Sequence, residues 1–171
     1  PLAESLLTNP LLNPEIEAEK YIRIEPATDQ IEAINVPTAK AALEGARDIL
    51  VERFSETADL LSLLRTKLWN EGILSTTVIS GKEHAEEEKF RDYYAYSEPI
   101  RTIPSHRALA FFRGQALHIL LVDLKLADAL EALDFHPCAA LIAKQFHIEN
   151  KNRPADKWLL EVCQWTWRVK L

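Results

Sequence analysis

The sequence is short of the residues on which most catalytic and cofactor-binding motifs depend. It contains four glycines, two cysteines and no methionine. With so few glycines, the chain has no glycine-rich loop that could cradle a phosphate, and it has no GxSxG nucleophile elbow. Cys138 and Cys163 lack a CxxC spacing and lie in helical patterns, so we expect two buried thiols in a reducing cytoplasm.

The five histidines have no spacing typical of a metal site. His136 and Cys138 share an HPC string that is similar to part of a zinc deaminase motif, but the CxxC pair and the nearby glutamate of that motif are absent. Ser105 and His106 are adjacent, and adjacent residues on a helix point about 100° apart, so they do not indicate a catalytic pair. We therefore expect no metal, no cofactor and no catalysis within these residues.

Long apolar runs are also lacking, and none approaches the roughly 20 residues that a membrane-spanning helix needs. Nothing at the N-terminus resembles a signal peptide. The 171 residues are 47% hydrophobic and 27% charged, which is typical of one ordinary globular domain or two small ones. We expect a cytoplasmic protein without membrane contact. A net charge of −6 argues against the whole chain acting as a nucleic-acid clamp.

The segment 89–114 differs from the rest in being aromatic and locally basic. We treat it as a connector with a short helix, in which Ser105 is expected to cap the helix and Gly114 to end it in a left-handed turn. Pro99 and Pro104 stiffen its backbone. Four of its aromatic residues fall within seven positions: Phe90, Tyr93, Tyr94 and Tyr96. Its two acidic residues, Asp92 and Glu98, are outnumbered by five basic residues: Lys89, Arg91, Arg101, Arg107 and Arg113.

Aromatic side chains interleaved with arginine can bind unpaired bases and phosphates. We therefore predict nucleic-acid contacts by Lys89, Arg101 and Arg107. The alternative is that the aromatic residues belong to the core and the arginines pair with nearby acids.

Helical periodicity dominates the remaining sequence. Helix starts are indicated at Asn13-Pro14, Thr38, Ser55, His136-Pro137 and residues 152–154. Residues 36–72 are predicted to form a helical hairpin. Two sets are expected to face inward: Leu43, Ala46, Ile49, Leu50 and Phe54 on the first helix, and Leu60, Leu61, Leu64 and Leu68 on the second. Leu109 is also expected to be buried. In the last helix the expected inward stripe is Trp158, Val162, Trp165 and Val169, with Trp167 pointing elsewhere.

Strand signals are weaker than helix signals. Residues 117–126 predict a strand, whose partner is either residues 73–79 or a strand outside the chain. Residues 73–79 are rich in β-branched residues, but could instead extend the preceding helix. We expect a loop with a helical turn near 28–34 and a solvated helix face at 83–88. The predicted fold is mainly α and multihelical, with at most a small two-stranded β element.

Three stretches carry a family resemblance: ALEGARDILVERFSE at 42–56, the string GKE…KFRDYY…SEP…IPSHRALAFFRG within 81–114, and RPADKWLLEVCQWTWRVKL at 153–171. With them the chain resembles the bacterial Tex family of transcription accessory proteins, relatives of a eukaryotic elongation factor and histone chaperone. Two stretches depart from the family pattern. GKEHAEEEKF stands where the family usually reads one residue shorter and keeps a glycine, and QALHILLVDLKL replaces a more polar, glycine-rich version.

The resemblance implies an elongated helical N-terminal region with helix-turn-helix-like packing. This region is followed by a nuclease-like domain, helix-hairpin-helix modules and an RNA-binding OB-fold domain. Residues 1–171 would be a fragment of that N-terminal region, in keeping with a start at Pro1 and an end at Leu171 inside a helical pattern. Residues 153–171 would lead into the nuclease-like domain. We expect such a fragment to self-associate through Trp165 and Val169.

Two functions follow from the resemblance. In the first, the parent protein binds RNA or DNA as a transcription accessory factor, and this chain is a helical scaffold within it. In the second, the chain is a protein docking module, against RNA polymerase or the ribosome, without a nucleic-acid contact of its own.

Overall fold

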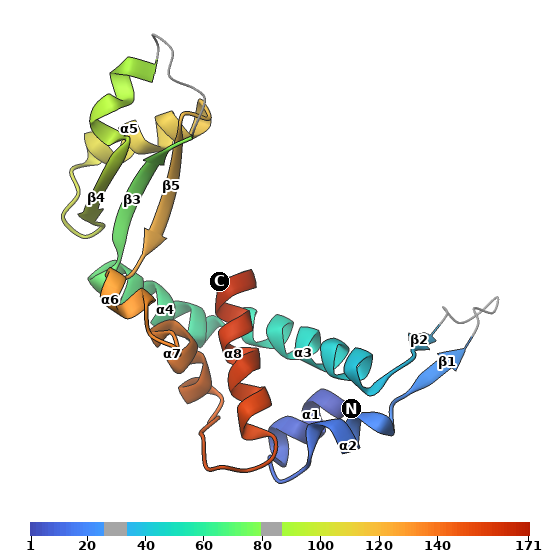
Figure 1. Cartoon of the computed structure of the whole chain (residues 1–171). Coiled ribbons are helices and arrows are strands. Elements are labelled where there is room, and N and C mark those ends of the chain that lie inside the picture. The colour runs from blue at the N-terminus through green and yellow to red at the C-terminus, as the bar shows by residue number, and fades with distance from the viewer. Residues whose placement is uncertain (26–33, 80–86) are drawn as a thin grey trace. The chain divides into compact units, whose positions relative to one another are not determined.

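The computed structural model describes residues 1–25, 34–79 and 87–171. The chain divides into two compact units (Figure 1), of which unit 1 comprises residues 1–61 and 135–171 and unit 2 comprises residues 62–134. The mainly α prediction is confirmed. None of the helices in the described ranges is both long and apolar enough to cross a membrane.

Unit 1 is built around a long helix, α3 (Ala39–Ser55), which packs against α1 (Leu2–Thr8), α2 (Pro14–Glu19) and α8 (Asp156–Lys170). Helix α7 (Pro137–Gln145) packs against α8. Strands β1 (Arg23–Glu25) and β2 (Ile34–Val36) form a short antiparallel hairpin before α3. The expectation of a loop in this region is therefore wrong for the residues of the two strands. The helical turn expected near 28–34 lies outside the described residues, apart from residue 34.

Three predicted helix starts are confirmed by their capping hydrogen bonds. The Asn13 side chain accepts from the backbone N–H groups of Glu15 and Ile16 at 3.0 and 3.2 Å, and Thr38 Oγ1 accepts from Ala41 N at 3.1 Å. His136 Nδ1 accepts from Cys138 N at 3.1 Å. Each cap satisfies N–H groups that a helix start otherwise leaves without an acceptor.

The predicted cap at Ser55 is wrong. Ser55 is the last residue of α3, and its hydroxyl donates back to the Glu52 carbonyl at 2.9 Å. Helix α4 (Ala58–Glu71) begins three residues later. The two predicted helices of residues 36–72 are thus present, and their packing as a hairpin stays a prediction.

The core of unit 1 confirms the predicted burial of Leu50 and Phe54, while Ile49 is exposed. The Phe54 ring stacks on Phe146 with 4.0 Å between centroids. Both cysteines are fully buried and unbridged, as expected, and burial raises the pKa of the Cys163 thiol to about 12.

The predicted stripe of α8 is wrong at two positions, because Trp165 is 41% and Val169 is 54% exposed. Burial instead follows smaller residues: Leu159, Val162, Cys163 and Thr166. Small side chains let α8 lie close to its neighbours, whereas the indole of Trp165 lies outside, with the Arg47 guanidinium 4.7 Å above it. Trp167, expected to point elsewhere, is half-buried and stacks on His136.

A buried carboxylate, Asp156, organises the loop before α8. It is 1% exposed and accepts hydrogen bonds from the backbone N–H groups of Lys151 and Arg153 at 2.7 and 2.9 Å. The Arg153 guanidinium lies 2.8 Å from the carboxylate. Burial, the largest influence, raises the pKa of Asp156, but the Arg153 and Lys151 hydrogen bonds together outweigh it, so the net pKa lies below its ordinary value.

Unit 2 contains a three-stranded antiparallel sheet of order β4-β3-β5, built from β3 (Ile73–Val78), β4 (Ala95–Pro99) and β5 (Leu120–Lys125). Thr76 of β3 faces Tyr96 on one side and Val122 on the other. The strand predicted within 117–126 is confirmed, and residues 73–79 are its partner. The prediction of at most a two-stranded β element is wrong, because the connector 89–114 supplies β4 as a third strand.

The other elements of unit 2 are α4 from Ser62 onward, the 3-10 helix η1 (Glu87–Tyr93), α5 (Ser105–Ala116) and the short α6 (Asp128–Glu131). Helix α5 packs along β5, and η1 contacts β3, β4 and α5. Figure 1 shows α5 on one face of the sheet. Residues 83–86 of the expected helix face lie outside the described residues.

Both predicted ends of α5 are wrong. Ser105 is the first helical residue, and Pro104 occupies the cap position without a side-chain hydrogen bond. Gly114 lies inside the helix, and the left-handed residue after α5 is His118, with φ of 56°. Gly114 serves close packing instead, because a Cβ there would lie only 2.6 Å from Leu120 Cδ1.

Candidate nucleic-acid interface

The aromatic residues of the connector form a packed cluster. Tyr93, Tyr96 and Phe111 meet edge to face, with ring centroids 5.2 to 5.9 Å apart. Phe111 is fully buried, and Phe90 packs with Ile119 and Leu120. The alternative that these aromatic residues belong to the core therefore holds for Phe90 and Phe111. Phe111 is 0% exposed, so its ring has no face on which a base could stack.

Arg107, one of the three predicted contact residues, is engaged inside the fold. Its guanidinium forms an ion pair with Glu98 and lies 5.3 Å from the centroid of the Tyr96 ring. Tyr96 Oη also donates to the Glu98 carboxylate, at 3.1 Å. The hydrogen bond from Arg107 is the main cause that lowers the pKa of Glu98, whereas burial and then this Glu98 contact raise the pKa of Tyr96. A phosphate would have to compete with Glu98 for Arg107.

Lys89 and Arg101, the other two predicted residues, are both exposed. Lys89 is on η1 and lines a surface cleft of about 640 Å³ between η1 and α5. Arg101 lies in the turn between β4 and α5 and does not line this cleft. The cleft is lined by Lys89, Phe90, Tyr93, His106, Leu109, Ala110, Arg113 and Leu117.

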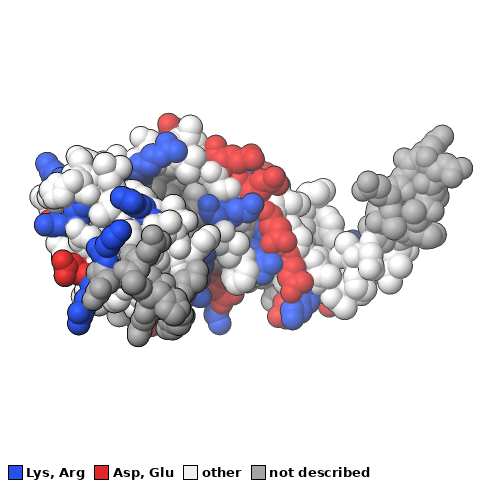
Figure 2. All heavy atoms as spheres, turned by 90° about the horizontal axis from the view of Figure 1, so that it is seen from above, with Lys and Arg blue, Asp and Glu red and all other residues white. Residues whose placement is uncertain are grey.

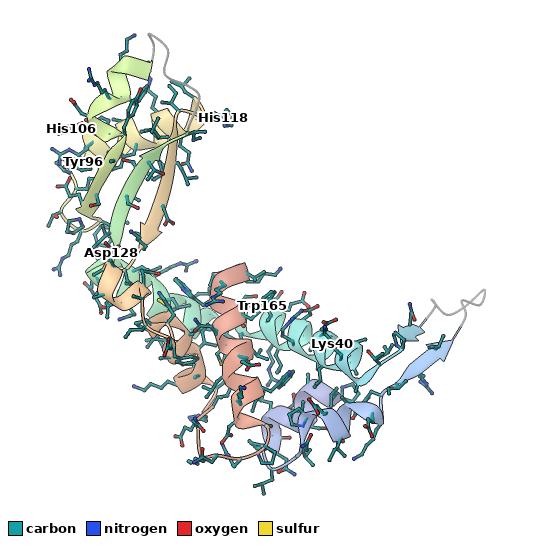
Figure 3. All side chains as sticks on the ribbon, viewed as in Figure 1. Lys40, Tyr96, His106, His118, Asp128 and Trp165 are labelled. Atoms are coloured by element: carbon teal, nitrogen blue, oxygen red, sulfur yellow. The ribbon has the colours of Figure 1, made fainter. Side chains whose placement is uncertain are left out.

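Sequence reasoning missed two residues of this cleft, Arg113 and His106. Both are exposed on α5. The signal was present in the spacing, because positions 106, 109, 110, 113 and 117 fall on one side of a helix. Figure 3 shows His106 near the start of α5 and His118 just beyond its end.

The predicted burial of Leu109 is wrong, because the side chain is 69% exposed. Helix α5 turns Phe111 and Gly114 toward the sheet. A residue two positions before Phe111 is rotated by about 200° around the helix and therefore points away from the sheet. Leu109 becomes a wall of the cleft instead of part of the core.

The chemistry available at the cleft is cationic at its rim and apolar between. No carboxylate whose side chain the structure describes forms an ion pair with Lys89 or Arg113, in contrast to Arg107. Lys and Arg side chains are prominent on the face of unit 2 that Figure 2 presents. Within the described ranges, no three His, Cys, Asp or Glu residues gather as metal ligands would. The arrangement is suited to binding an anion that also has an apolar part.

Comparison with known proteins gives one consistent result. The family model described as Tex central region-like matches residues 9–171. Across the whole chain, 42% of residues are identical to Protein tex of Bordetella pertussis and 42% to Protein YhgF of Escherichia coli. The identity to the transcriptional accessory protein Tex of Neisseria gonorrhoeae is 40%.

The chain covers 21% of the length of each of these relatives. Its expected place in a helical N-terminal region of the parent protein stays a prediction. The resemblance inferred from the three sequence stretches is confirmed, and the chain belongs to the Tex family, matching it in the central region.

Proposed function

We propose that the chain is a scaffold within a nucleic-acid-binding transcription accessory factor of the cytoplasm, beside nuclease-like and RNA-binding domains. The name of the gonococcal relative, transcriptional accessory protein Tex, supports a role of the parent in transcription. Helix-turn-helix-like packing in this region is part of the proposal. RNA or DNA would be held mainly by other parts of the parent, and unit 2 would add phosphate contacts.

One observation carries the nucleic-acid part of the proposal. Lys89 and Arg113 are exposed beside a cleft, and neither forms an ion pair with a described carboxylate. Such cations can neutralise phosphates and release counterions without first leaving a carboxylate whose side chain the structure describes. Arg101 is exposed as well and can add a contact, while Arg107 contributes less because Glu98 holds it.

The test is the salt dependence of nucleic-acid affinity, measured with single charge-removing variants of the parent protein. Lys89→Gln, Arg101→Gln and Arg113→Gln should each reduce the slope of log affinity against log salt by about 0.7 to 0.9. Arg107→Gln should change the slope less. Unchanged slopes in all four variants would mean that these side chains serve only the fold, and the scaffold role would stand alone.

A protein docking module, against RNA polymerase or the ribosome, is the second candidate. Exposed apolar side chains on α5 and at its C-cap favour it, since Leu109, Phe112 and Leu117 are 69%, 52% and 48% exposed. Direct titration of purified core polymerase and purified ribosomes with the chain and its Phe112→Ser variant distinguishes this candidate. Binding that is lost in the variant, without any effect of nucleic acid, would favour docking.

A further inference from the structure

The cleft between η1 and α5 combines charge and apolar surface in a fixed order. Along α5, His106 comes first, Leu109 follows one turn later, and Arg113 and Leu117 follow at intervals of four residues. Lys89 and Tyr93 line the cleft from η1. Polar or charged side chains and apolar side chains therefore alternate along this wall of the cleft.

The walls of the cleft are held by the fold. Thr76, which is 2% exposed, donates its hydroxyl to the Tyr93 carbonyl at 2.6 Å and thereby ties η1 to the sheet. The Tyr93 ring meets Phe111 of α5 edge to face, with centroids 5.2 Å apart. Gly114 lets α5 lie directly on Leu120 and Phe90. A ligand would enter a preformed site, so little binding energy is lost in ordering it.

The size of the cleft is better suited to one small planar group than to the surface of a nucleic-acid duplex. Its volume of about 640 Å³ is within the range of sites for small molecules and cofactors. A base stacked inside a duplex cannot enter such a hollow without being flipped out at a cost of a few kcal/mol. An unpaired base has free faces, and the aliphatic side chains of Leu109 and Leu117 can cover one.

We propose that this cleft takes one unpaired nucleotide of a single-stranded nucleic acid. The base lies against Leu109 and the exposed His106 ring, and the adjoining phosphates bind Lys89 and Arg113. This assignment rests on the proposed function and narrows it from nucleic acid in general to single strands. It also separates the roles of the cations, which bind any phosphate backbone, from that of the apolar wall, which binds only a free base.

The experiment uses the 171-residue chain and fluorescence anisotropy with short labelled oligouridylate, oligoadenylate and a duplex of equal length. Leu109→Ser should weaken single-strand binding at least about fivefold and leave duplex binding unchanged. Leu121→Ser is the matched control, because Leu121 is 58% exposed on β5 and lies outside the cleft. Circular dichroism of each variant confirms that it is folded.

A double variant, Lys89→Gln with Arg113→Gln, separates this inference from the proposed function. It should weaken single-strand and duplex binding together. If it does so while Leu109→Ser has no effect, the nucleotide site is refuted and the phosphate contacts stand. If none of the variants changes affinity, the nucleotide site and the phosphate contacts of Lys89 and Arg113 are both refuted. If Leu109→Ser abolishes binding of an acidic, leucine-containing peptide and no oligonucleotide binds, the cleft is a protein site and the inference is overturned.

Discussion

Gly114→Ala adds a single methyl group at the point where α5 lies closest to the sheet. A Cβ at this position would be 2.6 Å from Leu120 Cδ1, 2.8 Å from Leu120 Cγ and 3.2 Å from Phe90 Cδ1. Carbon atoms in contact prefer about 3.5–4.0 Å, so Leu120 has to move or α5 has to lift from β5. Gly45→Ala, in the middle of α3, is the matched control, because a Cβ there would meet no atom within 4 Å.

Both substitutions replace a helical glycine by alanine, and the main difference between them is the packing around the added methyl group. Replacing glycine by alanine in a helix interior stabilises by about 1 kcal/mol. Overpacking a core costs about 1–3 kcal/mol. We therefore expect Gly45→Ala to raise the free energy of unfolding by about 1 kcal/mol, and Gly114→Ala to lower it by about 1 kcal/mol. The difference of about 2 kcal/mol isolates the close approach of α5 and β5.

Native-state hydrogen exchange is the suitable assay, since it reports α3 in unit 1 and α5 in unit 2 separately. Protection should increase in α3 for Gly45→Ala and decrease in α5 and β5 for Gly114→Ala. Equal stabilisation by both substitutions would refute the packing of α5 on Leu120.

Three further predictions concern stability and association. Leu64→Ala should cost about 2–5 kcal/mol of unfolding free energy, because Leu64 is only 4% exposed, and denaturant titration measures it. The lowered pKa of Asp156 stabilises the fold above the ordinary carboxyl pKa, and this contribution is lost as pH falls through the folded-state value. Asp156→Asn should therefore be less stable at neutral pH and show a shallower acid transition, and an unchanged pH profile would contradict this. Self-association through the exposed Trp165 and Val169 should raise the sedimentation coefficient with concentration and be reduced in Trp165→Gln, whereas a sharp monomer at every concentration would exclude it.

Local signals in the sequence predicted the features that depend on local chemistry. The helix starts at Asn13, Thr38 and His136 were predicted from the local sequence, and in the structure each of these side chains accepts a hydrogen bond from a backbone N–H group. The cap at Ser55 failed because two helices follow each other closely there, and the signal does not say which residue ends the first helix. Leu50 and Leu64 were predicted to be buried from helical spacing, and both are.

The features that were missed depend on contacts distant in sequence. Strand β4 is short, and in the sequence its alternating Tyr96 and Glu98 look like part of an aromatic, charged connector. Its identity as a strand depends on pairing with β3, which is distant in sequence. Pairing of the arginines with nearby acids was left open as an alternative, and the sequence did not identify the pair of Arg107 with Glu98, because these residues lie nine positions apart on a helix and a strand. Small residues that allow close packing determine which side of α8 is buried. The prediction followed a stripe of large apolar residues that includes Trp165, and this stripe does not mark the buried side.

A nucleic-acid surface of unit 2 at the cleft of η1 and α5 is tested most directly by photo-crosslinking of the chain to a 4-thiouridine oligonucleotide, followed by mass spectrometry of the crosslinked peptides. We predict crosslinks in residues 89–93 and 106–117, including His106 and Tyr93, and their loss in the Lys89→Gln, Arg113→Gln double variant. Crosslinks confined to unit 1, or crosslinks in the cleft that survive removal of both cations, would contradict the claim.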